Sequence, residues 1–274
     1  MSAALAFSTL GCGELELAEV LALAAARRLP AVELRTLGGT TDILGYFRQT
    51  FGRPEDLRSL VAASGVGIAS VDTSVEAMTA GEADRRWLEA LLPWVVATGA
   101  RRIRVFDGGQ SGSAQEIATA GDLVQWWKHF CASQGRSVEM AIETHDALAK
   151  PEALQRFLDA VPEGRILWDT YHTWHAGAEP PSTTWQRLHG RTSHLHVKDS
   201  RVTASTRSYV PPGQGDYPFE ELIGRLAADR FEGTISLEWE RFWHPELPPL
   251  AAALDGFQNV FSPRSGATFL TPGG

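Results

Sequence analysis

The chain has 274 residues, of which 43% are hydrophobic and 21% charged, and its formal net charge is −8 at pH 7. This length allows one large domain or two domains of about 130 residues, and the composition can fill a sizeable apolar core. The negative charge, without any basic run, argues against nucleic acid or an anionic membrane surface as the main partner.

Cysteine usage and apolar runs exclude further classes of protein. The two cysteines, Cys12 and Cys131, stand without a CxxC motif, so neither a disulfide framework nor a cysteine-rich zinc site is indicated. No apolar run reaches the roughly 18 residues of a membrane span, and the first residues lack the basic region of a signal peptide. We therefore expect a cytoplasmic protein that does not act at a membrane. A homo-oligomer remains compatible with these features.

Strand-like and helix-like segments alternate from one end of the chain to the other. The expected strands are residues 4–10, 31–36, 66–73, 101–107, 137–143, 165–170, 192–198 and 233–239. The expected helices follow them, at 14–28, 54–64, 83–98, 115–133, 151–160, 182–189, 218–229 and 248–260. Such alternation predicts a parallel sheet, and eight units predict closure into a single (β/α)8 TIM barrel over residues 1–274. An open doubly wound sheet is the structural alternative.

Two segments are expected to be irregular. Residues 199–217, after the seventh strand, form the longest stretch without a strand or helix pattern. A loop of this length in a compact domain is often functional, so we expect an active-site loop, with a floppy surface loop as the alternative. Residues 262–274 are expected to form an irregular tail.

The polar residues of the expected strands share one parity. In the last strand Ile235 and Leu237 alternate with Ser236 and Glu238, and the second, fourth, fifth and seventh strands alternate in the same way. In a barrel the apolar parity must face the helices, so the polar parity faces the lumen. Buried charges are costly unless they are paired or bind a metal, so a lumen of this kind indicates chemistry. A sheet with one solvated face is the alternative.

Four strong ligand side chains stand at the carboxyl ends of the last four expected strands. They are Glu143, Asp169, His196 and Glu238. One such residue is ordinarily a cap, a surface charge or a structural histidine. Four in succession predict a divalent metal site at the face where TIM barrels carry their active sites.

The three carboxylates and one imidazole form an anionic, oxygen-rich donor set. It suits one hard or borderline divalent ion, with Mn2+ or Mg2+ favoured and Co2+ or Zn2+ also compatible. Without a cation the three carboxylates would repel one another. The ion would polarise a substrate carbonyl as a Lewis acid.

Further residues near these strand ends are candidates for contact with substrate. His145 and His172 follow two of the ligands, Glu240 follows Glu238, and Lys198 could stabilise a developing oxyanion or pair with a carboxylate. Weaker candidates for substrate contact are Arg35, Arg104 and Asp107. His194 shares the parity of His196 one layer deeper, which favours a supporting role.

Six motifs carry a resemblance to a known superfamily. They are VELR at 32–35, IETHD at 142–146, WDTYHT at 168–173, HLHVKDS at 194–200, GQGDYPF at 213–219 and ISLEWE at 235–240. In this order they resemble the xylose isomerase-like TIM-barrel superfamily, and within it the sugar phosphate isomerase/epimerase branch.

The resemblance implies roles for particular residues. In the ketose 3-epimerases of this superfamily one metal is held at the positions of Glu143, Asp169, His196 and Glu238, and the two glutamates also move protons. The histidine of their DxxH motif contacts substrate, which corresponds to His172. The ETHD segment around His145 is closer to inosose dehydratase-like and dehydroshikimate dehydratase-like members.

The leading functional prediction is a metal-dependent isomerase or epimerase of a small polyhydroxy carbonyl compound, acting through an enediolate. A metal-dependent dehydratase is the runner-up, because the same enolate can expel a β-hydroxyl group. Two weaker alternatives are a DNA-repair endonuclease and a non-catalytic binding barrel. The endonuclease would need early histidines and a basic face, whereas no histidine precedes His129 and the net charge is negative.

Overall fold

Eight strands pair in parallel to form one sheet in the computed structural model, which describes residues 3–203 and 207–261. These strands are β1 (Ala4–Phe7), β2 (Ala31–Leu34), β3 (Gly67–Glu76), β4 (Arg102–Phe106), β5 (Glu139–Glu143), β6 (Arg165–Asp169), β7 (Thr192–Val197) and β10 (Thr234–Leu237). Their order in the sheet is β1-β10-β7-β6-β5-β4-β3-β2. A parallel bridge between Ser8 and Glu33 joins the two edges, so the sheet is a nearly closed barrel.

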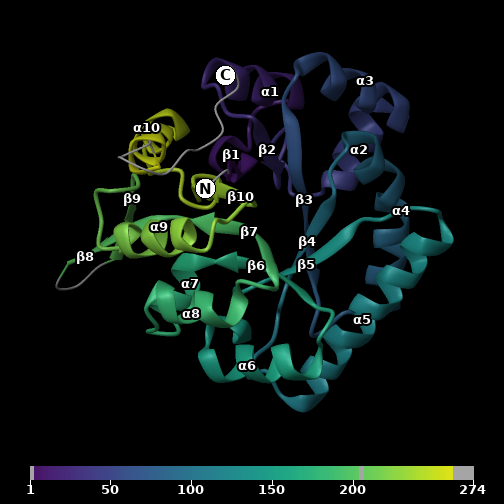
Figure 1. The fold of residues 1–274 in the computed structure, drawn as a ribbon. Coiled ribbons are helices and arrows are strands. Elements are labelled where there is room, and N and C mark those ends of the chain that lie inside the picture. Colours follow the sequence, from purple (N-terminus) through teal and green to yellow (C-terminus); the bar gives the residue numbers. More distant parts are fainter. Residues whose placement is uncertain (1–2, 204–206, 262–274) are drawn as a thin grey trace.

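Helices surround the barrel on its outer side (Figure 1). They are α1 (Leu17–Ala26), α2 (Ile43–Phe51), α3 (Pro54–Ser64), α4 (Glu82–Thr98), α5 (Ala114–Ser133), α6 (Pro151–Ala160), α7 (Thr170–His175), α8 (Pro181–Leu188), α9 (Phe219–Ala228) and α10 (Leu250–Val260). The strand–helix alternation and the TIM barrel predicted from the sequence are thus confirmed. None of the described helices combines the length and apolarity needed to span a bilayer.

Alternate side chains of each strand face different surroundings, as expected. Ile235 and Leu237 are fully buried in the apolar layer between the sheet and the helices. Ser236 and His196, which are level with each other in the β7–β10 register, lie on the opposite parity and are also fully buried. The lumen is therefore a dry, charged interior, which makes the pairing of each charge decisive.

Two of the described helices were not predicted from the sequence. Helix α2 is capped by Asp42, whose side chain accepts a hydrogen bond from the Gly45 backbone. Helix α7 begins directly after Asp169, which also acts as its N-cap. Short helices without a long apolar period give a weak sequence signal, whereas capping by a side chain is enough to start them.

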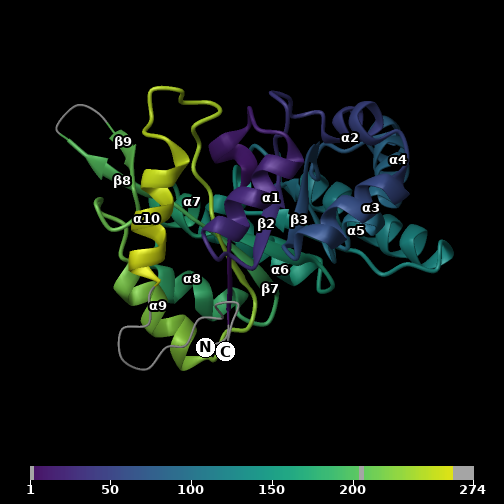
Figure 2. The same cartoon turned by 90° about the horizontal axis from the view of Figure 1, so that it is seen from above.

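Residues 199–217 are not wholly irregular. β8 (Asp199–Val202) and β9 (Arg207–Val210) form an antiparallel hairpin. The hairpin projects at the edge of the molecule beside α10 (Figures 1 and 2). The expectation of one long unstructured loop was therefore wrong for these eight residues, since their alternating pattern is too short to stand out. The expected irregular tail, 262–274, lies outside the described residues.

Candidate metal centre at the mouth of the barrel

The four candidate ligands converge at the carboxyl end of the barrel. Glu143, Asp169 and His196 lie at or near the ends of β5, β6 and β7, and Glu238 directly follows β10. One ligand atom from each lies within 4.8 Å of the ligand atoms of the other three. The strand register explains this, because Asp169 is level with His196 across β6 and β7.

The ligand separations suit one bound ion. Nδ1 of His196 lies 3.1 Å from Oε1 of Glu143 and 3.4 Å from Oε1 of Glu238. Neighbouring ligands of an octahedral ion at about 2.1 Å are themselves about 3.0 Å apart. Oδ1 of Asp169 accepts a hydrogen bond from the His172 backbone, so Oδ2, which faces Lys198, is the oxygen that could bind an ion. The buried acidic and histidine residues can therefore hold a metal ion.

Glu33 on β2 supports His196 from below. Its Oε1 lies 2.7 Å from Nε2 of His196, and its Oε2 lies 2.6 Å from Nε2 of His194. All three side chains are buried. Holding Nε2 in this way directs Nδ1 of His196 at the other ligands, as metal-binding histidines are commonly oriented. The expectation that His194 lies one layer deeper agrees with this arrangement.

Lys198 occupies the carboxylate-rich side of the site. Its Nζ lies 2.9 Å from Oδ2 of Asp169, 2.5 Å from Oε2 of Glu238 and 2.6 Å from Oε1 of Glu240. Burial alone would lower the pKa of Lys198, but these carboxylates raise it well above its usual range. The ammonium group therefore stays charged, so the site contains a fixed cation next to the place for an ion. Pairing with carboxylates was one of its two predicted roles.

The electrostatics of two ligands favour occupancy by a cation. Burial raises the pKa of Asp169 to about 7, while Lys198 opposes that rise. Burial would lower the pKa of His196, but the charges of Glu33, Glu238 and Glu143 hold it well above its usual range. Protons on Asp169 and His196 thus supply part of the positive charge that a divalent ion would bring to this anionic cluster.

His145 and His172 lie together beside the ligands. Their ring centroids are 4.7 Å apart, and the His145 ring also contacts Phe106. Nε2 of His172 lies 3.2 Å from Nζ of Lys198 and 3.4 Å from Oδ2 of Asp169. The side chain of His145 is 38% exposed, so this imidazole can reach a molecule at the mouth.

Two arginines flank the site near Phe106. Arg104 pairs with Glu143, Nε to Oε2 at 3.1 Å, and with Asp72 at 3.7 Å. Arg35 is 5% exposed, and its Nη1 has no hydrogen-bond partner among the described residues. Arg35 therefore keeps a donor group without a hydrogen-bond partner among the described residues, whereas Arg104 pairs with the candidate ligand Glu143.

Asp107 supports the loop after β5, and its predicted contact with substrate stays a prediction. Its two carboxylate oxygens accept hydrogen bonds from the backbones of Asp146 and Leu148, at 2.7 and 2.6 Å. It thereby holds the loop that carries His145.

Glu33 and Asp72 were missed as site residues by the sequence reasoning. Glu33 shares the polar parity of its strand, and Asp72 stands two residues from Ser70, whose hydroxyl donates to it at 2.7 Å. That parity was the available signal. It could not reveal that β2 and β3 reach the same centre as β5 to β7, because that proximity requires the closed barrel.

Comparison with known proteins finds relatives with the same fold. Residues 21–260 match the family model described as xylose isomerase-like TIM barrel. An inosose dehydratase of Clostridium botulinum is 22% identical over 174 residues, which are 57% of this chain and 57% of the dehydratase. The match thus spans little more than half of that curated relative.

Several solved structures are similar over nearly the whole chain. The probable 3-DHS dehydratase AsbF of Bacillus anthracis has a TM-score of 0.73 at 18% identity, covering 97% of this chain and 100% of its own. The IolI protein, solved with a bound zinc atom, has a TM-score of 0.75 at 16% identity, covering 94% and 98%.

A D-allulose 3-epimerase from Methylomonas sp. has a TM-score of 0.68 at 14% identity, covering 94% and 97%. At these identities the likenesses establish the fold, and they agree with the match to the family model over most of the chain. The chain therefore belongs to the xylose isomerase-like TIM-barrel family.

Proposed function

We propose that this protein is a divalent-metal-dependent isomerase or epimerase of a small polyhydroxy carbonyl compound, of sugar or cyclitol type, acting through an enediolate. The observation that carries the proposal is the buried group Glu143, Asp169, His196 and Glu238, whose ligand atoms lie within 4.8 Å of one another. The dehydratases and the epimerase among the similar proteins support this range of substrates. The proposal includes a cytoplasmic location and a small molecule, not nucleic acid, as partner.

The four ligands would hold one ion, with Mn2+ or Mg2+ favoured by the oxygen-rich donor set. When bound, the ion supplies Lewis-acid polarisation of the substrate carbonyl. Glu143 and Glu238 each keep one oxygen toward His196, while the second oxygen pairs with Arg104 or Lys198. Each glutamate is therefore held in one orientation, which suits a group that takes a proton from a fixed position.

Proton movement distinguishes the reaction types. In the proposed reaction one glutamate takes the proton from the carbon next to the carbonyl, and a proton returns to another face or to the neighbouring carbon. Lys198, with its ammonium among Asp169, Glu238 and Glu240, keeps these carboxylates in place. Arg35 and His145 would orient the substrate from the mouth.

A dehydratase is the second candidate, favoured by the pair His145 and His172. These imidazoles lie 4.7 Å apart beside the ligands, where one could protonate a leaving hydroxyl group. A carbon–hydrogen and a carbon–oxygen bond would then break, and water would leave as a double bond forms. The match to an inosose dehydratase favours the same chemistry.

Incubation of the Mn2+-loaded protein with a panel of ketoses, inososes and cyclic hydroxy acids in deuterated water tests both candidates. Mass spectrometry of the products distinguishes them, because an isomerase or epimerase keeps the mass or adds deuterium, whereas a dehydratase removes one water. We expect Glu143→Gln and Glu238→Gln to keep metal at reduced affinity and to lose about 10²–10⁴-fold in turnover. Near-parental turnover of both variants would exclude enolisation by these residues.

The control for these variants is Arg48→Gln, an exposed change on α2. It removes one exposed charge that makes none of the described contacts with the candidate ligands, and it should leave turnover unchanged. A protein that binds none of Mn2+, Mg2+, Co2+ and Zn2+ would contradict the proposal for both reaction types.

A further inference from the structure

Arg35 is a buried cation without a counter-charge of its own. It directly follows β2 at the mouth of the barrel, and it is only 5% exposed. Within the described ranges 3–203 and 207–261, no carboxylate forms an ion pair with its guanidinium group, and Nη1 has no hydrogen-bond partner. A buried charge that lacks a partner is costly, so this arginine needs an anionic group.

The guanidinium group of Arg35 lies beside the candidate metal centre. Its central carbon is 5.7 Å from the centre of the Phe106 ring, and Phe106 is level with the candidate ligand Glu143 in the β4–β5 register. The ring of His145, which was predicted to contact substrate, lies 4.8 Å from the same phenyl ring. A group held by Arg35 would therefore belong to a molecule in the proposed active site.

The carboxylates at the mouth are paired with other cations. Nε of Arg104 lies 3.1 Å from Oε2 of Glu143. Three more carboxylates lie 2.5–2.9 Å from Nζ of Lys198, namely those of Asp169, Glu238 and Glu240. None of these four carboxylates is within ion-pair distance of Arg35, so the protein itself does not neutralise this arginine there.

The surroundings of Arg35 disfavour its charge in the absence of a bound anion. Burial lowers its pKa to about 10, and the nearby charge of Arg104 lowers it further, while Asp72, Glu143 and Glu238 oppose this. The guanidinium group still carries its charge at pH 7. An anionic group next to it would offset both the burial and the repulsion from Arg104.

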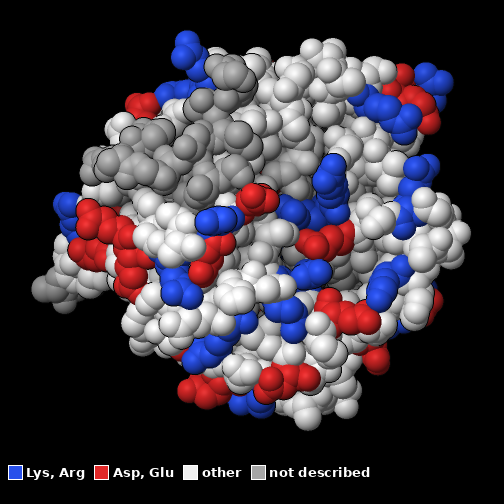
Figure 3. Space-filling view, in the orientation of Figure 1, with Lys and Arg blue, Asp and Glu red and all other residues white. Residues whose placement is uncertain are grey.

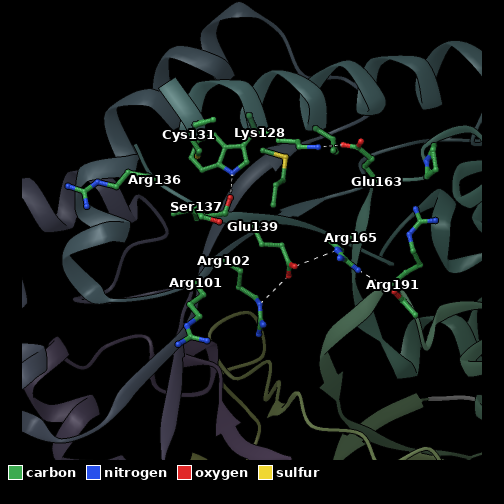
Figure 4. Close-up of a pocket in the computed structure, with 17 residues that line it drawn as sticks. Arg101, Arg102, Lys128, Cys131, Arg136, Ser137, Glu139, Glu163, Arg165 and Arg191 are labelled. Atoms are coloured by element: carbon green, nitrogen blue, oxygen red, sulfur yellow. Dashed lines mark hydrogen bonds and ion pairs between the residues drawn. The ribbon is translucent and has the colours of Figure 1, made fainter. Parts of the chain in front are cut away.

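Other cations of the molecule lie among carboxylates. Lys and Arg side chains are interspersed with Asp and Glu on the face shown in Figure 3. At the amino ends of the strands, Glu139 lies 3.5 Å from Arg102 and 3.7 Å from Arg165, as Figure 4 shows. Arg35 is buried and yet lacks such a carboxylate, which sets it apart as a place for an anion from outside the chain.

We propose that the substrate of the candidate active site carries a carboxylate group, which the guanidinium group of Arg35 binds. This inference rests on the proposed function and narrows the substrate to a small polyhydroxy carbonyl acid. A carboxylate has one charge and two oxygens, which match a single guanidinium fork. A phosphate monoester carries about −1.5 to −2 charges at pH 7, which one arginine does not balance, and Arg104 already pairs with Glu143.

Isothermal titration calorimetry of the full chain with matched acid and amide probes tests the proposal. The pairs are D-glucuronate with D-glucuronamide and quinate with quinamide, whose members differ in charge but hardly in shape. We expect at least one acid to bind at least about tenfold more tightly than its amide, because only the acid forms a charge-assisted pair. Arg35→Gln should reduce this preference to within about twofold.

Two further variants make the test specific. Arg35→Met removes the same charge with a different side chain, so a folding defect in one variant still leaves the other to decide. Arg48→Gln removes an exposed charge on α2 and should keep the full preference for the acid. Affinity for Mn2+ checks the fold of the Arg35 variants, and it should not fall, since a positive charge near the ligands has been removed.

The proposal is overturned if neither acid binds the wild type more tightly than its amide. It is equally overturned if both Arg35 variants keep the preference, since the ion or another residue would then hold the carboxylate. Tighter binding of D-glucose 6-phosphate than of either acid would assign the site to phosphate instead and overturn the proposal as well. The titrations are repeated without Mn2+, because failure to bind Mn2+ contradicts the proposed function, whereas the preference for acid over amide reports on Arg35.

Discussion

The two ring nitrogens of His196 face different carboxylates in the lumen of the barrel. Nδ1 faces Glu143 and Glu238, while Nε2 is held by Glu33. Glu33 in turn contacts His194, whose Nδ1 lies 3.3 Å from Nη1 of Arg102 near the amino end of the barrel. A continuous row of buried polar contacts therefore runs below the candidate metal centre, and it fixes the imidazole before any ion binds.

Replacing Glu33 with glutamine is expected to weaken Mn2+ binding by about 10–100-fold, because the carboxylate that orients His196 and raises its basicity is lost. Calorimetric titration with Mn2+ measures the change. The control is Glu89→Gln, which removes one exposed carboxylate on α4. An affinity of Glu33→Gln within about twofold of the wild type would show that His196 needs no such support.

The segment after β7 is held by one buried carboxylate. Asp199 accepts hydrogen bonds from the backbones of Ser200, Gly213, Gly215 and Tyr217, at 2.8 to 3.1 Å. These bonds fold the GQGD motif back onto the base of the β8–β9 hairpin. The hairpin in turn reaches the mouth of the barrel, where the hydroxyl of Tyr209 donates to Glu240 at 3.1 Å.

Gly215→Ala is expected to destabilise the fold by ~1–3 kcal/mol, because overpacking of a filled site costs about that much. The added Cβ would lie 2.2 Å from Oδ1 of Asp199 and 2.4 Å from the Ser200 carbonyl oxygen. Urea unfolding measures the change. Gly224→Ala in α9 is the matched control, since its Cβ meets nothing within 4 Å and should stabilise the helix by ~1 kcal/mol. Equal effects of the two changes would contradict the close contact at Gly215.

The start of α5 depends on an ionised glutamate. Glu116 accepts hydrogen bonds from the backbones of Ser113 and Gln110, both at 2.7 Å, and these bonds lower its pKa to about 2. The folded pKa lies below the ordinary value of 4.5, so the stabilisation is complete above pH 4.5 and is lost as the pH falls toward 2.

The gap in melting temperature between the wild type and Glu116→Gln should therefore be larger at pH 7 than at pH 3. Thermal unfolding followed by circular dichroism at both pH values measures this gap. The comparison isolates Glu116, because all other titrating groups are common to the two proteins. A gap that stays constant with pH would mean that ionisation of Glu116 does not support the helix.

The candidate metal centre would join distant parts of the chain. Its ligands come from β5, β6 and β7 and from the residue after β10, so a bound ion connects strands across half of the sheet order. An ion that binds the folded barrel and not the unfolded chain adds stability by mass action.

Removal of metal with a chelator is expected to lower the melting temperature of the whole barrel. At a free ion concentration of about 100 times Kd the gain is ~2.7 kcal/mol, which corresponds to roughly 5–10 °C for a chain of this size. Differential scanning fluorimetry with and without Mn2+ measures the shift. Asp169→Asn should abolish most of it, and a variant that retains the full shift would place the ion elsewhere.

The order of strands and helices could be predicted from local pattern. Strand alternation has a period of two, and helices have caps and apolar faces. Both patterns can therefore be recognised within short windows of sequence. The positions of Glu143, Asp169, His196 and Glu238 at strand ends followed from the same pattern, since parallel strands end at one face. Their assignment as metal ligands stays a prediction until an ion is measured.

Contacts across the barrel could not be predicted in this way. Glu33 and His196 are 163 positions apart in sequence, and they meet because closure brings β2 and β7 to opposite sides of one lumen. A register shift between Val32 and Glu33 sets the height of that carboxylate, and no turn connects these strands to specify it locally. The partners of Lys198 depend likewise on closure. The spacing of apolar residues and the composition thus determine the strands, the helices and their polar faces. The partner of each buried charge is decided only when the sheet closes and excludes water from the lumen.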